Sequence, residues 1–403
     1  MNITVQSLKK VSIQINTFSL FMFFKLLIFL LIISIIIDFI LRLKPRSKLV
    51  LIPINYILNR SKSREEIVCE FEIRNFSKNK ETMIPKLNIN CEFIDQGILE
   101  NQYIKKEIIL DDGTSQRIIN NYWQTIIIKA GSSIKIKFIL TIKKFFKKDS
   151  FIWLKVNWQN YGHFGLINKE NYFLLNNYQN RKKTREIKNI FINKGINALA
   201  IKTNILGAFD NPIQTITKYC EDIVKEGDIL VVGETPLAIM QGRYENPLNI
   251  KYSFISKILC YFFHPTSSLA TACGMQLLIS KIGFTRILFS LIIGFFFKLI
   301  GVKGIFYRLT GAESSLIDDI SGTTIPYDKT IVLGPKNPKK FCDEITKILK
   351  VESAVVDVND LGGVKILASS NKSINKLLKR ALKKNPAGNG DEKTPIVIVR
   401  RKV

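Results

Sequence analysis

An apolar run close to the N-terminus constrains the fold of this chain more than any other feature. Residues 18–41 include only Lys25 and Asp38 among the charged residue types. About twenty apolar residues are enough for a helix to cross the hydrocarbon layer of a membrane. Lys25 lies near one end, where a long stem lets an ammonium group reach the lipid headgroups. The run therefore predicts a transmembrane helix over residues 18–41, preceded by an N-terminal tail at 1–17.

A cleaved signal peptide is the alternative interpretation of the same run. No small-residue cleavage site follows residues 26–37, which favours a retained anchor. Four Lys or Arg residues lie within residues 42–48, and Lys9 and Lys10 precede the run. Because basic flanks stay on the cytoplasmic side, the denser C-terminal flank places the bulk of the chain there. The sequence predicts a single-pass membrane protein with membrane lipid as a partner.

Charge and cysteine content argue against two common classes of site. The net charge of +27 would suit nucleic-acid binding, because a basic chain is attracted to phosphates. The excess lysine is accompanied by isoleucine and asparagine along the whole chain, without a zinc-finger, RRM or KH signature, so no specific nucleic-acid partner is expected. The six cysteines form no CxxC pair, and two histidines are too few for a histidine metal site. The cysteines are expected to be free thiols in a reducing compartment.

Residues 48–178 have the pattern of short strands separated by turns. Seven runs are rich in β-branched and aromatic residues, at a spacing typical of an immunoglobulin-like or related β-sandwich. Trp123, Trp153 and Trp158 could form a ligand surface, but tryptophans in a sandwich more often pack in the core or at its rim. The expected strands are 49–58, 67–74, 86–93, 107–110, 118–128, 134–142 and 151–158.

A change of composition marks a further domain. The polar, basic stretch 179–195 predicts a linker. Residues 196–403 then alternate strand-like and helical runs, which predicts an α+β fold. The expected strands are 228–232, 330–333, 354–358 and 396–399, and the expected helices are 212–224, 338–349 and 373–383.

An apolar insert at 253–308 interrupts this alternation. Its most apolar part, residues 287–297, has basic residues on both sides. The segment is short for a membrane span, and basic flanks suit anionic lipid headgroups. It predicts an interfacial helix, with a buried core helix as the alternative.

Four stretches in the last two hundred residues resemble, in the same order, those of the coenzyme F(420)-0:gamma-glutamyl ligase family. The resemblance covers about residues 196–403 and includes neither the N-terminal apolar run nor the sandwich. The stretches are EGDILVVGETPLAIMQGRY at 226–244, DDISGTTIPYDKTIVLGPKNP at 318–338, AVVDVNDLGG at 354–363 and GNGDEKTPIVIVRR at 388–401.

This resemblance implies an enzyme that joins a small-molecule carboxylate to the amine of glutamate. The implied nucleotide is GTP, or ATP, and the implied metal is Mg²⁺ or Mn²⁺, because phosphoryl transfer needs hard cations at the phosphates. The family also implies an α+β fold that forms homodimers. Matched residue by residue, the resemblance assigns the metal to Asp360 and to Asp318 or Asp319. It assigns the nucleotide to Arg243, Asn389, Gly362 and Gly363, and it assigns no catalytic residue.

Each of these residues also has an ordinary structural interpretation. An Asp before Gly-Gly is commonly a turn residue, and an Asp pair before Ser-Gly is usually a turn or a cap. Arg243 could equally form a structural salt bridge. Only the ordered set of four stretches favours the functional interpretation.

The chain also departs from the family pattern. Residues 233–241 contain no lysine or arginine where the family carries basic residues, and 363–369 lack its Arg-Pro. The insert at 253–308 has no counterpart in the family. These departures leave an alternative function open, a non-catalytic membrane scaffold that retains the ligase fold and recruits a protein partner through the sandwich.

Overall fold

The computed structural model describes most of the chain, which divides into two units. The first unit combines Met1–Pro45 with Tyr252–Ser315, and the second combines Arg46–Lys251 with Leu316–Val403. The apolar insert therefore belongs to a different unit from the residues on either side of it. The described residues are 22, 25–37, 47–61, 64–93, 104–111, 117–118, 123–142, 151–176, 186–193, 195–265, 267–318, 320, 325–359, 361–388 and 392–401.

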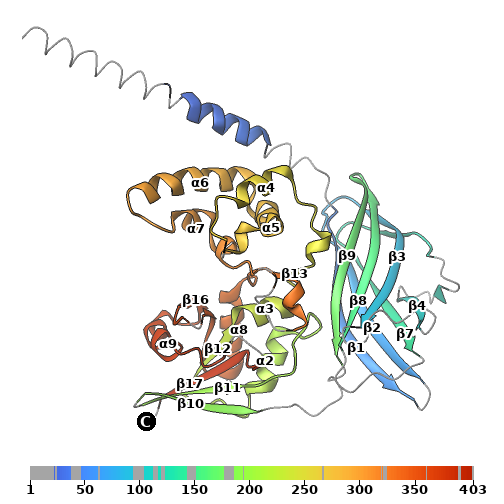
Figure 1. Ribbon diagram of the computed structural model, residues 1–403. Helices are drawn as coiled ribbons and strands as arrows, with labels where there is room; N and C mark the ends of the chain where they lie inside the picture. The colour runs from blue at the N-terminus through green and yellow to red at the C-terminus, as the bar shows by residue number, and fades with distance from the viewer. Residues whose placement is uncertain are drawn as a thin grey trace, which may run out of the picture. The chain divides into compact units, whose positions relative to one another are not determined.

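A β-sandwich opens the second unit, as predicted (Figure 1). Its strands are β1 (Leu49–Arg60), β2 (Glu65–Asn75), β3 (Thr82–Phe93), β4 (Ile104–Asp111), β5 (Arg117–Ile118), β6 (Ile126–Ile128), β7 (Ser133–Ile142), β8 (Phe151–Gly162) and β9 (Gly165–Asn176). They form antiparallel sheets in the orders β1-β2-β7-β4-β5 and β6-β3-β8-β9. Because side chains alternate across a strand, every second residue of β2 and β8 is buried. Inward residues such as Phe71, Phe138 and Leu154 fill the core.

Two stretches of the sandwich differ from the sequence prediction. The run 118–128, expected to be one strand, contains parts of β5 and β6, which belong to different sheets. Strand β9 was not expected, because polar residues at 168–171 interrupt its apolar alternation. It forms because it pairs with β8 along its whole length, through a tight turn that ends at Gly165 with φ of 79°.

A mixed α/β region forms the rest of the second unit. Its strands are β10 (Ile187–Asn193), β11 (Ile196–Ile201), β12 (Ile229–Gly233), β13 (Tyr244–Glu245), β14 (Ile331–Val332), β15 (Glu352–Val358), β16 (Val364–Ser369) and β17 (Ile396–Arg401). Its helices are α2 (Pro212–Cys220), α3 (Glu234–Met240), α8 (Pro338–Leu349) and α9 (Asn375–Ala381). The main sheet has the order β10-β11-β17-β12-β15-β16, and β12 and β15 are parallel. Helices α2, α3 and α8 pack on one face and α9 on the other.

The α/β region corrects two predictions. The linker at 179–195 is too long at its C-terminal end, because residues 187–193 form β10. Pairing with β11 provides hydrogen-bond partners for the backbone of β10. This pairing cannot be inferred from the polar and basic residues around 187–193. Residues 234–240, which were not among the expected helices, form α3, and this helix buries Leu237 and Met240 against the sheet.

Helices make up the described part of the first unit (Figure 1). They are an apolar helix at Lys25–Ile37, α4 (Phe254–Cys260), α5 (Ala272–Ile282), α6 (Phe284–Leu299) and α7 (Ile305–Thr310). Residues 287–297, predicted to be helical, lie within α6. Gly283, with φ of 87°, separates α5 from α6, and these two helices differ in direction by 111°.

The predicted transmembrane helix is only partly described. Within 18–41 the structure describes Met22 and the helix Lys25–Ile37, and the remainder lies outside the described residues. Across the described ranges, no single helix has both the length and the apolar composition needed to cross a membrane. The bent pair α5 and α6 reaches that length and composition only when the two helices are taken together.

Candidate functional site

A cavity of about 360 Å³ lies at the carboxyl ends of the parallel strands β12 and β15. This is the edge of an α/β sheet at which loops most often build binding sites. One wall is the segment 203–206, and another is formed by the start of α3. Residues 356–359, the segment 385–388 and Lys393 complete much of the lining. Backbone hydrogen bonds from Thr203 to Lys393 and from Gly233 to Pro395 join these walls.

Three carboxylates line the cavity: Glu234, Asp318 and Asp357. Glu234 is the first residue of α3 and follows β12 directly, and only 7% of its surface is exposed. Asp318 is held by two backbone hydrogen bonds with Val332 of β14 and accepts a hydrogen bond from the Thr235 hydroxyl at 3.0 Å. Asp357 lies near the end of β15, in the strand predicted to carry the site.

Burial and neighbouring negative charge together raise the pKa values of carboxyl groups in this cavity. Burial raises the pKa of Glu234 to about 9, and Asp357 and Asp318 add to the increase, whereas Lys365 lowers it. Burial also raises the pKa of Asp318, although the hydrogen bond from Thr235 opposes that change. A buried carboxyl favours its neutral form because low polarity disfavours charge. Glu234 therefore keeps a proton at neutral pH.

Two lysines supply positive charge near the carboxylates. Lys365 lies opposite Asp357 in the β15–β16 ladder and acts on both Glu234 and Asp318. Lys393 lines the cavity from the segment before β17. The residues from 233 to 241 lack cations, but other parts of the fold bring lysines to the same place.

The sandwich contacts the cavity through aromatic residues. Tyr327 lines the cavity and donates a hydrogen bond from its hydroxyl to the carbonyl of Leu206 at 3.0 Å. The ring of Trp153, from β8, meets the Tyr327 ring edge-on at 5.6 Å. Three residues beyond Leu206, the Phe209 ring packs among Tyr56, Phe71 and Phe173 of the sandwich. The wall 203–206 is therefore fixed at its end by the sandwich.

Asp318 is the described residue among the predicted metal ligands, and it lies in the cavity wall. Asp319, Asp360 and the predicted nucleotide residue Asn389 lie outside the described residues. The neighbours of Asp360 nevertheless place the β15–β16 turn close to the cavity, because Asn359 is part of its lining.

Gly362 and Gly363 form the turn between β15 and β16 and do not line the cavity. Gly362 has φ of 83°, a conformation that favours glycine. A Cβ on Gly363 would lie 2.7 Å from the amide nitrogen of Asn359, and the Gly363 amide donates a hydrogen bond to the Asn359 side chain at 2.7 Å. Both glycines are therefore explained by the turn alone.

Arg243 is buried and does not line the cavity. Its guanidinium donates a hydrogen bond to the carbonyl of Gly334, and its own carbonyl accepts one from Leu333. It connects the turn after α3 to the segment after β14. The structural interpretation of this arginine fits these contacts better than a contact with phosphate.

Sequence reasoning missed Glu234, Asp357, Lys365 and Lys393 as site residues. Both acidic residues fall inside stretches that carry the family resemblance, at the end of an apolar strand. That position was a usable signal, since strand ends supply the sites of α/β folds. The lysines could not be found in this way. The pairing of β16 with β15 brings Lys365 close to the carboxylates, and the segment before β17 brings Lys393 to the cavity.

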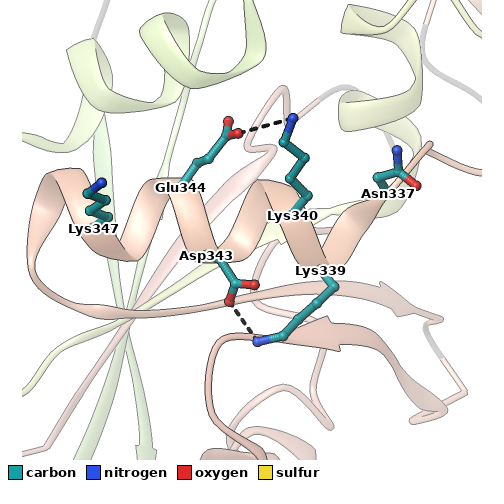
Figure 2. Close-up of a pocket in the computed structure, with 6 residues that line it drawn as sticks. All are labelled: Asn337, Lys339, Lys340, Asp343, Glu344 and Lys347. Carbon is teal, nitrogen blue, oxygen red and sulfur yellow. Dashed lines mark hydrogen bonds and ion pairs between the residues drawn. The ribbon is translucent and has the colours of Figure 1, made fainter.

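A second hollow lies along the outer face of α8 and differs in character (Figure 2). Lys339 pairs with Asp343 at 2.6 Å, and Lys340 pairs with Glu344 at 3.6 Å, each across one helical turn. These four side chains are all about half exposed or more. Such pairs are typical of a solvated helix face, and we assign no site there.

The described residues contain no group of three or more His, Cys, Asp or Glu side chains arranged to hold a metal ion. Mg²⁺, however, is usually held by one or two carboxylates together with phosphate oxygens and water. Asp318 and Asp357 provide two such carboxylates on one cavity. Burial is the main cause of the raised pKa of Glu234, and a divalent cation would relieve the additional repulsion from Asp357 and Asp318. The residues present fit a cation that arrives with a phosphate ligand.

Residues 50–179 match the family model for the N-terminal Ig-like domain of F420-0:gamma-glutamyl ligase. The sandwich is therefore an Ig-like domain of the kind found in that family. The predicted resemblance to this family is confirmed, but it includes the sandwich, which was expected to lie outside it. The resemblance of residues 196–403 stays a prediction.

No curated protein matches the chain. Similar solved structures include the putative ApaA protein from Bordetella pertussis, with 11% identity, 32% of this chain and 96% of that chain covered, and a TM-score of 0.19. A FixG-related protein from Vibrio parahaemolyticus has 10% identity, 32% and 95% coverage, and a TM-score of 0.18. The GAE domain of GGA2p from Saccharomyces cerevisiae has 14% identity, 32% and 99% coverage, and a TM-score of 0.19. Likenesses at these TM-scores carry no functional information.

Proposed function

We propose that this chain, which carries the Ig-like domain of the gamma-glutamyl ligase family, is a related ligase that acts at the cavity beside β12 and β15. The reaction would form an amide bond between a carboxylate and the amine of glutamate, with GTP or ATP as the energy source. The observation that carries this proposal is the group Glu234, Asp318 and Asp357, which places hard oxygen ligands at the strand ends.

The residues of the cavity have separable tasks in this chemistry. Asp318 and Asp357 would hold a Mg²⁺ or Mn²⁺ ion, which when bound offsets the charge on the nucleotide phosphates. Lys365 and Lys393 would add positive charge toward the same phosphates. Glu234 holds a proton at neutral pH, and a cation beside it would favour release of that proton.

The direct test is titration of the full chain with Mn²⁺ and GTP by calorimetry. Asp318→Asn should weaken metal-dependent nucleotide binding about tenfold or more, because it removes a charged ligand at nearly constant volume. Asp343→Asn, on the exposed face of α8, is the matched control and should bind as the wild type does. Repeating the titration in buffers of different ionisation enthalpy should reveal a proton released on Mn²⁺ binding, which Glu234→Gln should abolish.

The proposal would be wrong if the chain bound no nucleotide at millimolar concentration with either metal. Equal binding by wild type and Asp318→Asn would instead show that the site lies elsewhere. If the chain binds no nucleotide, a non-catalytic scaffold becomes the better explanation of its Ig-like domain.

A further inference from the structure

The first unit exposes more large apolar side chains than water-facing helices normally do. Around α4, Phe254, Tyr261 and Phe262 are 76%, 87% and 72% exposed. At the end of α6, Phe295, Leu299 and Ile300 are 60%, 68% and 72% exposed. Soluble proteins rarely leave such residues grouped on a surface, and groups of this kind usually mark a contact with a partner or a membrane.

Helix α6 changes character along its length. In its first half Phe284, Ile287 and Ser290 are buried within the unit. From Ile293 onward the large apolar residues are exposed, whereas Gly294 packs against Phe306 of α7. A helix that is apolar all round is normally buried in a protein core or in lipid, and most of the large side chains in the second half of α6 lie outside the core of its unit.

The apolar helix at Lys25–Ile37 belongs to the same unit and contacts the start of α6. The Thr285 hydroxyl donates a hydrogen bond to the carbonyl of Ser34 at 3.1 Å, and Ser34 is fully buried. Elsewhere on that helix, Leu26 and Phe29 are 55% and 59% exposed. The insert and the N-terminal helix therefore present apolar surface from one packed assembly.

The charge of the insert indicates which partner fits this surface. Within Tyr252–Ser315 the sequence has one acidic residue, Glu313, although the whole chain has 33 Asp and Glu residues. The same stretch carries six Lys or Arg residues, including Lys257, Lys298 and Lys303, which are exposed. A predominantly basic rim around an apolar surface complements a bilayer with anionic headgroups, whereas a protein partner would normally meet both signs of charge.

We propose that the helix Lys25–Ile37, α4 and the second half of α6 form one docking surface for an anionic lipid bilayer. The apolar residues enter the interfacial layer, and Lys257, Lys298 and Lys303 meet the headgroups. This membrane contact needs no helix that spans the bilayer, and it does not depend on the ligase proposal.

A tryptophan reporter on α6 tests the contact in the full chain. Phe296→Trp places an indole at a residue that is 45% exposed, and Phe76→Trp is the matched control on the sandwich, where 54% is exposed. Both variants are mixed with phosphatidylcholine and phosphatidylserine vesicles whose acyl chains carry bromine, which quenches tryptophan on contact. We expect quenching of the added fluorescence to be several-fold greater in Phe296→Trp than in the control. The three native tryptophans give both variants the same background.

Charge substitutions test the choice of lipid. Lys298→Gln with Lys303→Gln should weaken partition to phosphatidylserine vesicles roughly tenfold, because each lysine near an anionic surface contributes a several-fold factor. Lys339→Gln with Lys340→Gln, on α8, should leave partition unchanged (Figure 2). Equal quenching in Phe296→Trp and its control would overturn the proposal. So would a concentration-dependent blue shift of Phe296→Trp without quenching, which would show that a second copy of the chain covers α6.

Discussion

At the scale of single residues, Glu234 has a strongly raised pKa for a carboxyl group. Its carboxyl is buried at the start of a helix, close to two other carboxylates, and its pKa is raised to about 9. Residues with such perturbed pKa values are over-represented at functional sites. A buried carboxyl at this position lowers the stability of the fold, and a residue with a purely structural role would not require one.

We predict that Glu234→Gln flattens the dependence of stability on pH. The folded state keeps a proton on Glu234 up to about pH 9, whereas the unfolded chain releases it near the ordinary value of 4.5. The group's contribution to stability is therefore fully present below pH 4.5 and is lost as pH rises toward 9. In this window the wild type should lose up to roughly 1 kcal/mol per pH unit from this group. Urea unfolding at pH 5, 7 and 9 measures the slope.

Asp343→Asn should keep the wild-type slope, because that carboxyl is 53% exposed and lies on the outer face of α8. An unchanged slope in Glu234→Gln would mean that Glu234 is ionised in the folded protein. The raised pKa of Glu234 that supports the metal proposal would then be absent.

At the scale of elements, β12 has a buried polar group at each end. Glu234 follows its carboxyl end, and Asp228 precedes its amino end. Asp228 accepts two hydrogen bonds from Arg400 of β17, at 2.8 and 2.7 Å, and one from the Lys225 amide at 2.8 Å. This pair fixes the register of two central strands, while the other end of β12 remains available for chemistry.

Asp228→Asn should destabilise the fold by about 2 to 4 kcal/mol, since it leaves a partly buried guanidinium without its charge partner. The exposed pair of Lys339 and Asp343 is the internal comparison, and Asp343→Asn should cost at most about 0.5 kcal/mol. Urea midpoints of the two variants decide the matter. Similar losses would show that the ion pair at β12 contributes no more than a surface pair.

Local pattern predicted those elements whose sequences carry their own signals. Helix α8 begins and ends where its apolar periodicity, its Pro at the first turn and its basic C-terminus indicate. The sandwich was predicted from the spacing of runs rich in β-branched and aromatic residues, among them those that form β2 and β7. By contrast, β9 and β10 depend on pairing with neighbouring strands, and their polar residues conceal them.

The site was predictable in part for the same reason. Asp318 was found because its stretch resembles a known family, but its partners Asp357 and Lys365 are brought near by strand pairing. Arg243 and the two turn glycines have types that suit phosphate binding, yet their surroundings show structural tasks. Residue type alone could not distinguish phosphate binding from a structural role, because the contacts that distinguish them are made with residues that lie elsewhere in the sequence.

At the scale of the whole second unit, the segment 203–209 joins the cavity to the sandwich. Its first residues line the cavity, and Phe209 packs in the sandwich core. We predict that Phe209→Ala costs about 1 to 3 kcal/mol, less than a fully buried phenylalanine, because the side chain is only partly buried. The variant should also weaken nucleotide binding by loosening the wall, without touching any polar residue.

Thermal unfolding followed by tryptophan fluorescence, which reports on the sandwich, measures the first effect, and nucleotide titration measures the second. Phe76→Ala, an exposed residue of the sandwich, should change neither. A stable Phe209→Ala variant with unaltered binding would show that the sandwich and the cavity act independently.

The strand β14 also has a topological consequence for the chain. Tyr244 pairs with Val332 just before the helical insert leaves the second unit, and Asp318 pairs with the same residue just after the chain returns. The two stems therefore flank one strand, roughly 10 Å apart at two strand spacings. A bridge of a few residues can cover that gap. The helical insert can thus be replaced by a short connection, and we expect a chain in which a short turn joins Lys251 to Leu316 to keep the α/β fold in a form that is simpler to purify and crystallise.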